Sequence, residues 1–224
     1  MDTPAIKPEP KFAAEWAPFI PYADESACPE HLRAPLAVLK QRFGFLPNSM
    51  RLYMHNPGVL AAVLAMGRNI VANPEGTLDR VLKNKIGVIC SATNGCVYCT
   101  THQCDMLSRN GGSHEGWGVP LDEVRAQISG SEKAASDLER VCFDYARAAS
   151  FDAAGVTDEM RTRMKLHLTP AQIMELAAVV GFWKFLNTVH DSLNLPVESS
   201  NLHHTGYLDA WAGKGQGGAR GEGP

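Results

Sequence analysis

Apolar residues recur in this chain at steps of three and four, and no segment shows the alternation of a β-strand. One such run is followed directly by Gly44, a helix stop signal, and consists of Leu32, Leu36, Leu39 and Phe43. The segment 169–172 (Thr-Pro-Ala-Gln) is typical of a helix start. It offers a capping threonine, a proline at the first helical position and a glutamine that completes a capping box. The pattern predicts an all-α fold, a helical bundle in one domain.

Glycines and prolines divide the chain into expected helices. These are predicted over residues 32–43, 59–71, 78–93, 95–110, 121–128, 132–149, 158–168 and 171–186. We expect the helical domain to span residues 30–200. Residues 1–29 contain six prolines and predict an extended N-terminal arm, whereas the glycine-rich residues 201–224 predict a flexible C-terminal tail.

The composition excludes several classes of protein. Hydrophobic residues make up 45% of the 224, which is enough for a core and argues against a disordered chain. The formal net charge of −3 leaves no basic excess for a nucleic acid partner. No apolar stretch approaches the roughly 20 residues that cross a bilayer, and no signal peptide is visible at the start. We therefore expect a cytoplasmic protein with neither a nucleic acid nor a membrane partner.

Four of the six cysteines lie between positions 90 and 104, and two of them form a Cys-x-x-Cys pair at an expected helix start. Cys96 and Cys99 are about 60° apart around a helix and about 4.5 Å apart along it, so their sulfurs can close a disulfide. The free N–H groups of a first helical turn lower a thiol pKa. His102 lies one turn further and can take the thiol proton or pair with the thiolate. The segment predicts a redox-active dithiol.

Other interpretations of the cysteines remain open. Cys96, Cys99, His102 and Cys104 supply four candidate zinc ligands, but one helix cannot surround a tetrahedral ion, and Cys104 points about 140° away from Cys99. Buried structural cysteines are the better interpretation for Cys90, which lies in an apolar helical face, and for Cys142. We expect neither a bound metal nor a cofactor.

The cysteine segment resembles a known family. Residues 84–99, followed closely by a histidine, resemble the core of the alkylhydroperoxidase D-like / carboxymuconolactone decarboxylase superfamily. Residues 45–50 with 55–57 are similar to its first segment, and residues 175–177 with 195–198 are similar to its last helix and the segment after it. The similarity covers most of the chain between 35 and 198, in the right order.

The resemblance implies an all-helical fold that assembles as a homo-oligomer (a dimer, trimer or hexamer). Peroxidase members of this superfamily reduce hydroperoxides. By position, Cys99 would be the attacking thiolate that becomes a sulfenic acid. Cys96 would donate a proton and then close the disulfide. A thiol or dithiol reductant protein would reopen it.

Two positions depart from the peroxidase pattern. Where peroxidase members have a glutamate as the far end of a proton relay, this chain has Asn84, which cannot pass a proton at neutral pH. The usual histidine position is Gln103, and His102 lies one residue earlier on the same helix face. Glu175 is our candidate for a substitute acid, and His190 is interpreted as a surface group. A carboxylate hydrogen-bonded to His102 would restore the relay.

The sequence thus predicts a thiol-dependent peroxidase or disulfide oxidoreductase, with a peroxiredoxin-type activity. Its candidate site residues are Cys99, Cys96, His102, Glu175 and Asn84. In one alternative the protein has the same fold but acts on a small lactone acid, as a carboxymuconolactone decarboxylase does. Another is a non-catalytic oligomer that senses redox state or binds zinc.

Overall fold

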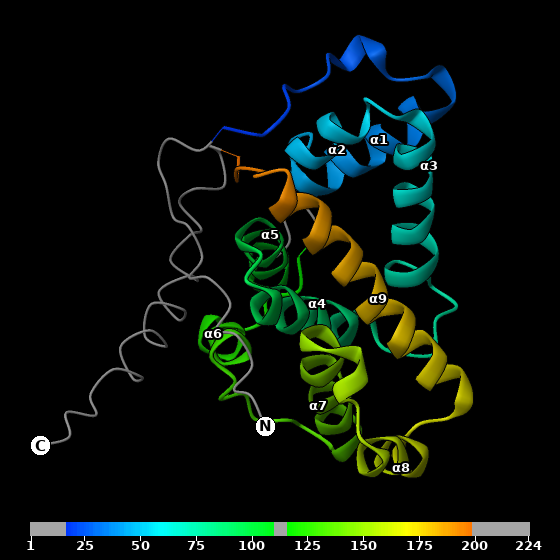
Figure 1. The fold of residues 1–224 in the computed structure, drawn as a ribbon, viewed down its shortest axis with the longest axis vertical. Coiled ribbons are helices and arrows are strands. Elements are labelled where there is room, and N and C mark those ends of the chain that lie inside the picture. Colours follow the sequence, from blue (N-terminus) through cyan, green and yellow to red (C-terminus); the bar gives the residue numbers. More distant parts are fainter. Residues whose placement is uncertain (1–16, 110–115, 199–224) are drawn as a thin grey trace, which may run out of the picture.

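The computed structural model describes residues 17–109 and 116–198, and this part of the chain is helical throughout, with no strand (Figure 1). Its α-helices are α1 (Glu30–Phe43), α2 (Asn48–Tyr53), α3 (Pro57–Met66), α4 (Arg80–Asn94), α5 (Val97–Ser108), α6 (Leu121–Ser129), α7 (Asp137–Phe151), α8 (Asp158–His167) and α9 (Pro170–Ser192). The predicted all-α fold is confirmed. None of the described helices has both the length and the apolar character needed to span a membrane.

The expected helices are present, with shifted ends and one addition. The short α2, which begins directly after Pro47, was not predicted. The helix expected over 59–71 is divided into α3 and a π-helical turn, Gly67–Val71. Most important for the site, α9 continues to Ser192 and does not end near residue 186. The predicted capping box of Thr169 and Gln172 is present at its start.

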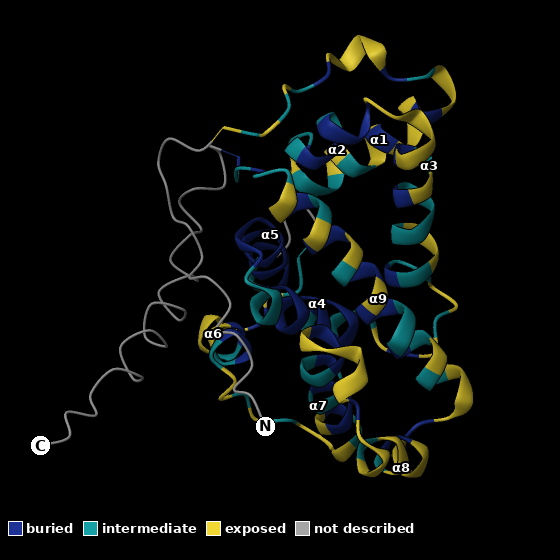
Figure 2. Ribbon diagram, viewed as in Figure 1, coloured by how far each residue is buried: buried dark blue, intermediate teal, exposed yellow. Residues whose placement is uncertain are grey.

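The central element is α4, which packs against α5, α6, α7 and α9. Figure 2 shows α4 and α5 as largely buried, while α8 and the outer faces of α1 and α3 are exposed. Ile86, Val88, Ile89 and Cys90 of α4 have no exposed surface. The polar residues Lys83, Asn84 and Ser91 are buried as well, so α4 exposes little of its surface to solvent.

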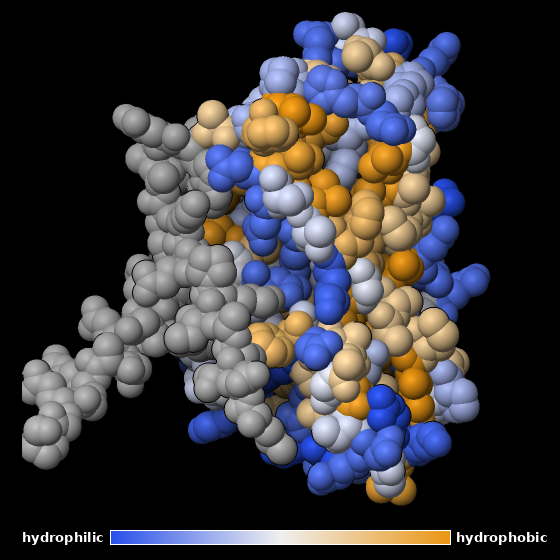
Figure 3. All heavy atoms as spheres, in the orientation of Figure 1, coloured by the Kyte–Doolittle hydropathy of each residue, from blue (hydrophilic) through white to orange (hydrophobic). Residues whose placement is uncertain are grey.

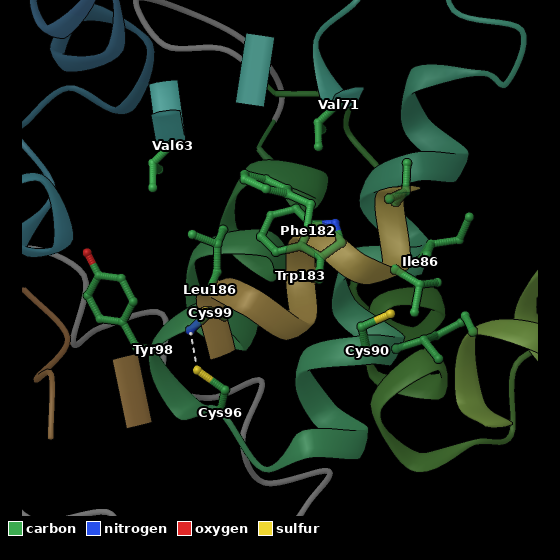
Figure 4. Packing of buried hydrophobic residues seen from close by; sticks show 14 of the residues in the cluster. Val63, Val71, Ile86, Cys90, Cys96, Tyr98, Cys99, Phe182, Trp183 and Leu186 are labelled. Carbon is green, nitrogen blue, oxygen red and sulfur yellow. Dashed lines mark hydrogen bonds between the residues drawn. The ribbon is translucent and has the colours of Figure 1, made fainter. Parts of the chain in front are cut away.

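The crossing of α4 and α9 depends on a glycine. A Cβ atom at Gly87 would lie 2.7 Å from Cε2 of Trp183, closer than such atoms pack. The indole of Trp183 therefore lies directly on the backbone of α4, in the core (Figure 4).

A sharp corner between α4 and α5 places the Cys-x-x-Cys pair. Gly95 ends α4 with φ 79°, a left-handed conformation that glycine adopts without strain. Cys96 is then the N-cap of α5, and its sulfur accepts a hydrogen bond from the N–H of Cys99 at 3.4 Å (Figure 4). The corner fixes both sulfurs at the first turn of a buried helix.

The described part of the predicted arm, residues 17–29, packs beside the end of α9. Phe19 donates its N–H to the carbonyl of Leu193 at 2.8 Å, and Asn194 donates to the carbonyl of Ala17 at 2.8 Å. The rest of the arm and the predicted tail at 201–224 lie outside the described residues.

Candidate active site

The Cys99 thiol lies at the third position of α5 and contacts a histidine from another helix. Its Sγ atom is 3.0 Å from Nδ1 of His190, and both side chains are buried. His190 belongs to the last turn of α9. The helix N-terminus at Cys99 favours a negative charge, and the helix C-terminus at His190 favours a positive one. The two helix ends therefore stabilise a thiolate–imidazolium pair.

A tyrosine forms a hydrogen bond with the other ring nitrogen of this histidine. The hydroxyl of Tyr53, from α2, is 2.8 Å from Nε2 of His190. Burial, and then the nearby Cys99 charge, raise the pKa of Tyr53, so its phenol stays neutral. The hydrogen bond orients the imidazole so that Nδ1 faces the sulfur.

The pKa values of the two cysteines are shifted in opposite directions. Burial alone would raise the pKa of Cys99. A hydrogen bond from the Cys96 thiol, the adjacent His190 and the charge of His102 outweigh it and lower the pKa to about 5. The pKa of Cys96 is raised by burial and by its interaction with Cys99. At neutral pH the pair is thus one thiolate, Cys99, beside one thiol that can supply a proton, Cys96.

A second hydrogen-bonded network begins at His102. Its Nε2 atom is 2.7 Å from Oε2 of Glu198, and both residues are buried. The other carboxylate oxygen accepts from the hydroxyl of Tyr98 at 2.8 Å and from the N–H of Asn48 at 2.5 Å. Burial alone would raise the pKa of Glu198, but His102 and these donors lower it, so the carboxylate is ionised. A carboxylate hydrogen-bonded to His102 is therefore present.

The structure corrects three interpretations made from the sequence. The histidine in contact with the thiolate is His190 and not His102, and His190 is not a surface group. Glu175 does not join the site. It pairs with buried Lys83 and accepts hydrogen bonds from the N–H groups of Thr77 and Leu78 near the start of α4.

Asn84 lies in the wall of the same cavity as Cys99 but on no hydrogen-bonded path to it. Its side-chain amide donates to the carbonyl of Arg80 at 2.8 Å, and its Oδ1 atom has no partner among the described residues. Glu198, on a segment far from Asn84 in sequence, is the carboxylate of the site.

A cavity of about 1010 Å³ leads to the thiolate. Its wall includes Cys99, His102 and His190, and the rest of the wall is mainly apolar. Hydrophobic side chains on the molecular surface gather over α9 and toward α3 (Figure 3). The aromatic and apolar part of the wall includes Leu39, Phe43, Val63, Leu64, Tyr98, Phe182, Trp183 and Leu186. Such a cavity suits an apolar organic molecule.

Three of the remaining cysteines, Cys90, Cys104 and Cys142, are inert by position. Cys90 and Cys142 are buried in the main core, where burial raises the pKa of each to about 12. Cys104 belongs to a separate apolar cluster with Val88 and Leu107. Among the described residues, the three that place metal-ligating atoms within 4.8 Å of one another are Cys96, Cys99 and His190, a set without Cys104 or His102.

Comparison with known proteins agrees with this architecture. Residues 57–116, which contain the Cys-x-x-Cys corner, match the model of the carboxymuconolactone decarboxylase family. Over this segment the chain is similar to the carboxymuconolactone decarboxylase family. Over 63 residues, 28% of this chain, it is 32% identical to the uncharacterized protein YnjA of Escherichia coli K12. The match spans 35% of that relative's length.

Several solved structures share the fold of this chain. The AhpD core of an uncharacterized peroxidase-related protein from Ralstonia eutropha JMP134 is similar with a TM-score of 0.72 at 18% identity, over 85% of this chain and 95% of that one. The debrominase Bmp8 gives a TM-score of 0.70 at 23% identity, over 85% and 96%. A peroxidase-related protein from Silicibacter sp. TM1040 gives 0.62 at 20% identity, over 89% and 96%.

Three residues of the site were not assigned to it from the sequence. His190 was missed because the helix was ended too early, although the apolar Val189 and Leu193 continue its pattern. Glu198 lay in a segment that resembled the family but was not considered as an acid. Tyr53 carried no sequence signal, because only the tertiary fold brings α2 against α9.

Proposed function

We propose that this protein is a dithiol peroxidase that reduces organic hydroperoxides. The observation that carries the proposal is the contact of Cys99 with His190, in the wall of a mainly apolar cavity and beside the Cys96 thiol. A lowered thiol pKa next to an oriented histidine is how cysteine nucleophiles are activated.

The first step is attack of the Cys99 thiolate on the terminal oxygen of the hydroperoxide. The O–O bond breaks, Cys99 becomes a sulfenic acid, and the alkoxide leaving group takes the proton of the His190 imidazolium to give an alcohol. The second step is attack of Cys96 sulfur on the Cys99 sulfenic acid. A disulfide forms, and the hydroxyl leaves with the Cys96 proton as water.

The His102–Glu198 pair supports these proton transfers. His102 borders the same cavity as Cys99, and Glu198 holds its ring. Turnover further requires a dithiol reductant protein, which would reopen the disulfide by exchange. We also propose that the chain acts as a homo-oligomer, as the family resemblance implies, and that it does so in the cytoplasm, as expected from the sequence pattern.

The cavity supports an organic substrate over hydrogen peroxide. Hydrogen peroxide is about the size of two water molecules, roughly 60 Å³ at the volume per water in the liquid. The cavity volume of about 1010 Å³ is many times larger, and its wall is mainly apolar. A bulky aromatic or alkyl group would displace water from that wall.

Thiol counting tests the proposal. Reduced protein treated with one equivalent of cumene hydroperoxide should lose two free thiols, with cumyl alcohol as the product. The Cys96→Ser, Cys99→Ser double variant should lose none, whereas Cys104→Ala, which removes a distant buried thiol, should lose two. Loss of no thiols in the wild type, or equal loss in the double variant, would exclude the proposal.

A second candidate is reductive dehalogenation of an aromatic substrate. Bmp8 is a debrominase, and a cysteine-to-alanine variant of it was crystallised with 2,3,4-tribromopyrrole. The aromatic wall of the present cavity favours a similar ring beside Cys99. The carbon–halogen bond would become carbon–hydrogen, the dithiol a disulfide, and halide and a proton would be released. Halide release from a bromopyrrole without peroxide, stoichiometric with disulfide, would favour this candidate.

A lactone decarboxylase activity remains the alternative that requires no dithiol chemistry. Activity of this type that survives the double cysteine variant would support it. The adjacent thiolate and thiol argue for redox chemistry.

A further inference from the structure

The two thiols and the neighbouring His190 form a cluster of potential metal ligands, a property that the proposed reaction does not use. Cys96, Cys99 and His190 place two sulfurs and one imidazole nitrogen within 4.8 Å of one another. Each residue has less than 5% of its surface exposed. The three come from two helix ends, so they surround a point from more than one side, as ligands on one helix cannot.

The chemistry of these donors selects the metal. Thiolate and imidazole ligands suit Zn²⁺, whereas Mg²⁺ and Ca²⁺ require several oxygen ligands. A set of two cysteines and one histidine is a known zinc ligand set, with water or substrate as the fourth ligand. Here the fourth position faces the cavity, because Cys99 and His190 both border it.

The surroundings also meet the needs of a metal site. Nδ1 of His190 faces the sulfurs, and Tyr53 holds Nε2, so the coordinating nitrogen is already aimed at the centre. The N–H of Cys99 donates to Cys96 Sγ and can continue to do so when that sulfur is a thiolate. His102 is engaged by Glu198, and Cys104 lies in another cluster, so neither belongs to the ligand set.

We propose that the reduced dithiol binds one Zn²⁺ through Cys96 Sγ, Cys99 Sγ and His190 Nδ1, with a fourth ligand from the cavity. Binding displaces the Cys96 proton and the proton shared by Cys99 and His190, so two protons are released per ion. Bound zinc occupies the sulfur lone pairs that attack a hydroperoxide. The ion therefore protects the reduced site and inhibits its reaction until it is removed. This inference goes beyond the peroxidase proposal and does not require it.

The test uses the reduced, chelator-washed chain titrated separately with Zn²⁺ and Co²⁺. We expect one equivalent of each to bind, with the thiolate-to-cobalt charge-transfer absorption and the strong visible bands of a tetrahedral Co²⁺ site. Cys96→Ser, Cys99→Ser and His190→Gln should each weaken Zn²⁺ binding more than about tenfold. Cys104→Ala removes a buried thiol outside the ligand set and is the matched control, which should bind within about twofold of wild type.

A measurement on the wild-type chain keeps the test valid if a variant does not fold. Oxidation to the Cys96–Cys99 disulfide should abolish binding, and reduction should restore it. Equal binding by the oxidised chain, or loss of binding in Cys104→Ala with retention in Cys99→Ser, would overturn the proposal. Thiol counting on metal-free protein reports separately on the peroxidase reaction, so the two proposals can fail independently.

Discussion

At the scale of single residues, the two histidines near the dithiol have different roles. His190 contacts the sulfur of Cys99, and Tyr53 fixes its orientation. His102 is one step removed and is held by Glu198. In the proposed reaction the thiolate paired with His190 is the attacking group, and the His102–Glu198 pair supports proton transfer around it.

The pH dependence of Cys99 reactivity follows from this pairing. Because its pKa is lowered to about 5, the thiolate fraction should rise through pH 5 and be complete near neutrality. In metal-free protein, the rate of alkylation by iodoacetamide should reach a plateau by about pH 7, where an ordinary thiol with a pKa of about 8.5 is still mostly protonated. Mass spectrometry of the labelled peptide identifies the residue.

The variant His190→Gln provides the control for that profile. Removing the imidazolium should move the midpoint of the alkylation profile to higher pH. An unchanged midpoint in this variant, or a wild-type midpoint near pH 8.5, would contradict the assigned role of His190.

We expect substitutions of the two glutamates to have different effects on the oxidation rate of Cys99. Glu198→Gln should slow oxidation of Cys99 by a hydroperoxide by about 10- to 100-fold, at or below the range of general acid–base groups. Glu175→Gln should leave the oxidation rate unchanged and lower the melting temperature, because it removes the carboxylate partner of buried Lys83. Stopped-flow oxidation and thermal unfolding measure the two effects. Slower oxidation in Glu175→Gln but not in Glu198→Gln would show that Glu175, and not Glu198, is the carboxylate of the site.

Individual site residues differed in how far sequence could predict them. Cys96, Cys99 and His102 share one helix, so local spacing placed them together. The carboxylate was assigned to Glu175 because it lay in an apolar helix, whereas its actual role is to pair with Lys83. Glu198 lies close to His102 because of the course that the chain takes after α9, and no local sequence pattern encodes that course.

At the scale of elements, α9 joins the core to the site. Its middle packs Trp183 on Gly87 of α4, and its end carries His190 to the start of α5. The sequence predicted this helix and its cap, but apolar periodicity alone did not fix its end. The last turn became part of the site because α2 and α5 bury it.

A methyl group at the α4–α9 crossing should destabilise the protein. In Gly87→Ala, the new Cβ would lie within 3 Å of three indole atoms, and the rigid ring would have to shift. We expect a lower urea midpoint, since overpacking costs about 1–3 kcal/mol and the helix propensity gain is at most about 1 kcal/mol. Gly181→Ala, on the same helix as Trp183, meets no atom within 4 Å and should be neutral or stabilising. Equal midpoints for the two variants would show that the crossing is not tightly packed.

At the scale of the whole molecule, helical periodicity without strand alternation predicted the all-α fold, because burial against other helices requires only one apolar stripe per helix. The cavity was not predictable in the same way. Its wall combines α1, α3, α5 and α9, and its shape depends on where these helices leave space.

Filling the cavity should change substrate preference. Val63 of α3 borders the cavity, and Figure 4 shows it apart from the Cys96 sulfur. Val63→Phe should lower kcat/KM for cumene hydroperoxide about tenfold and leave that for hydrogen peroxide within about twofold, because only the bulky substrate needs the space. Val59→Phe, at a partly exposed position of the same helix outside the cavity wall, is the control. An equal fall for both peroxides would show that the variant disturbs the thiolate and not the substrate space.

The most direct measurement of the central claim is the site of sulfenic acid formation. The Cys96→Ser variant cannot close the disulfide, and serine retains the capping oxygen for α5. After one equivalent of cumene hydroperoxide, a sulfenic-acid-specific dimedone probe followed by peptide mapping should label Cys99 alone. Labelling of Cys104 or Cys90 in place of Cys99, or no labelling while the hydroperoxide is consumed, would contradict the account.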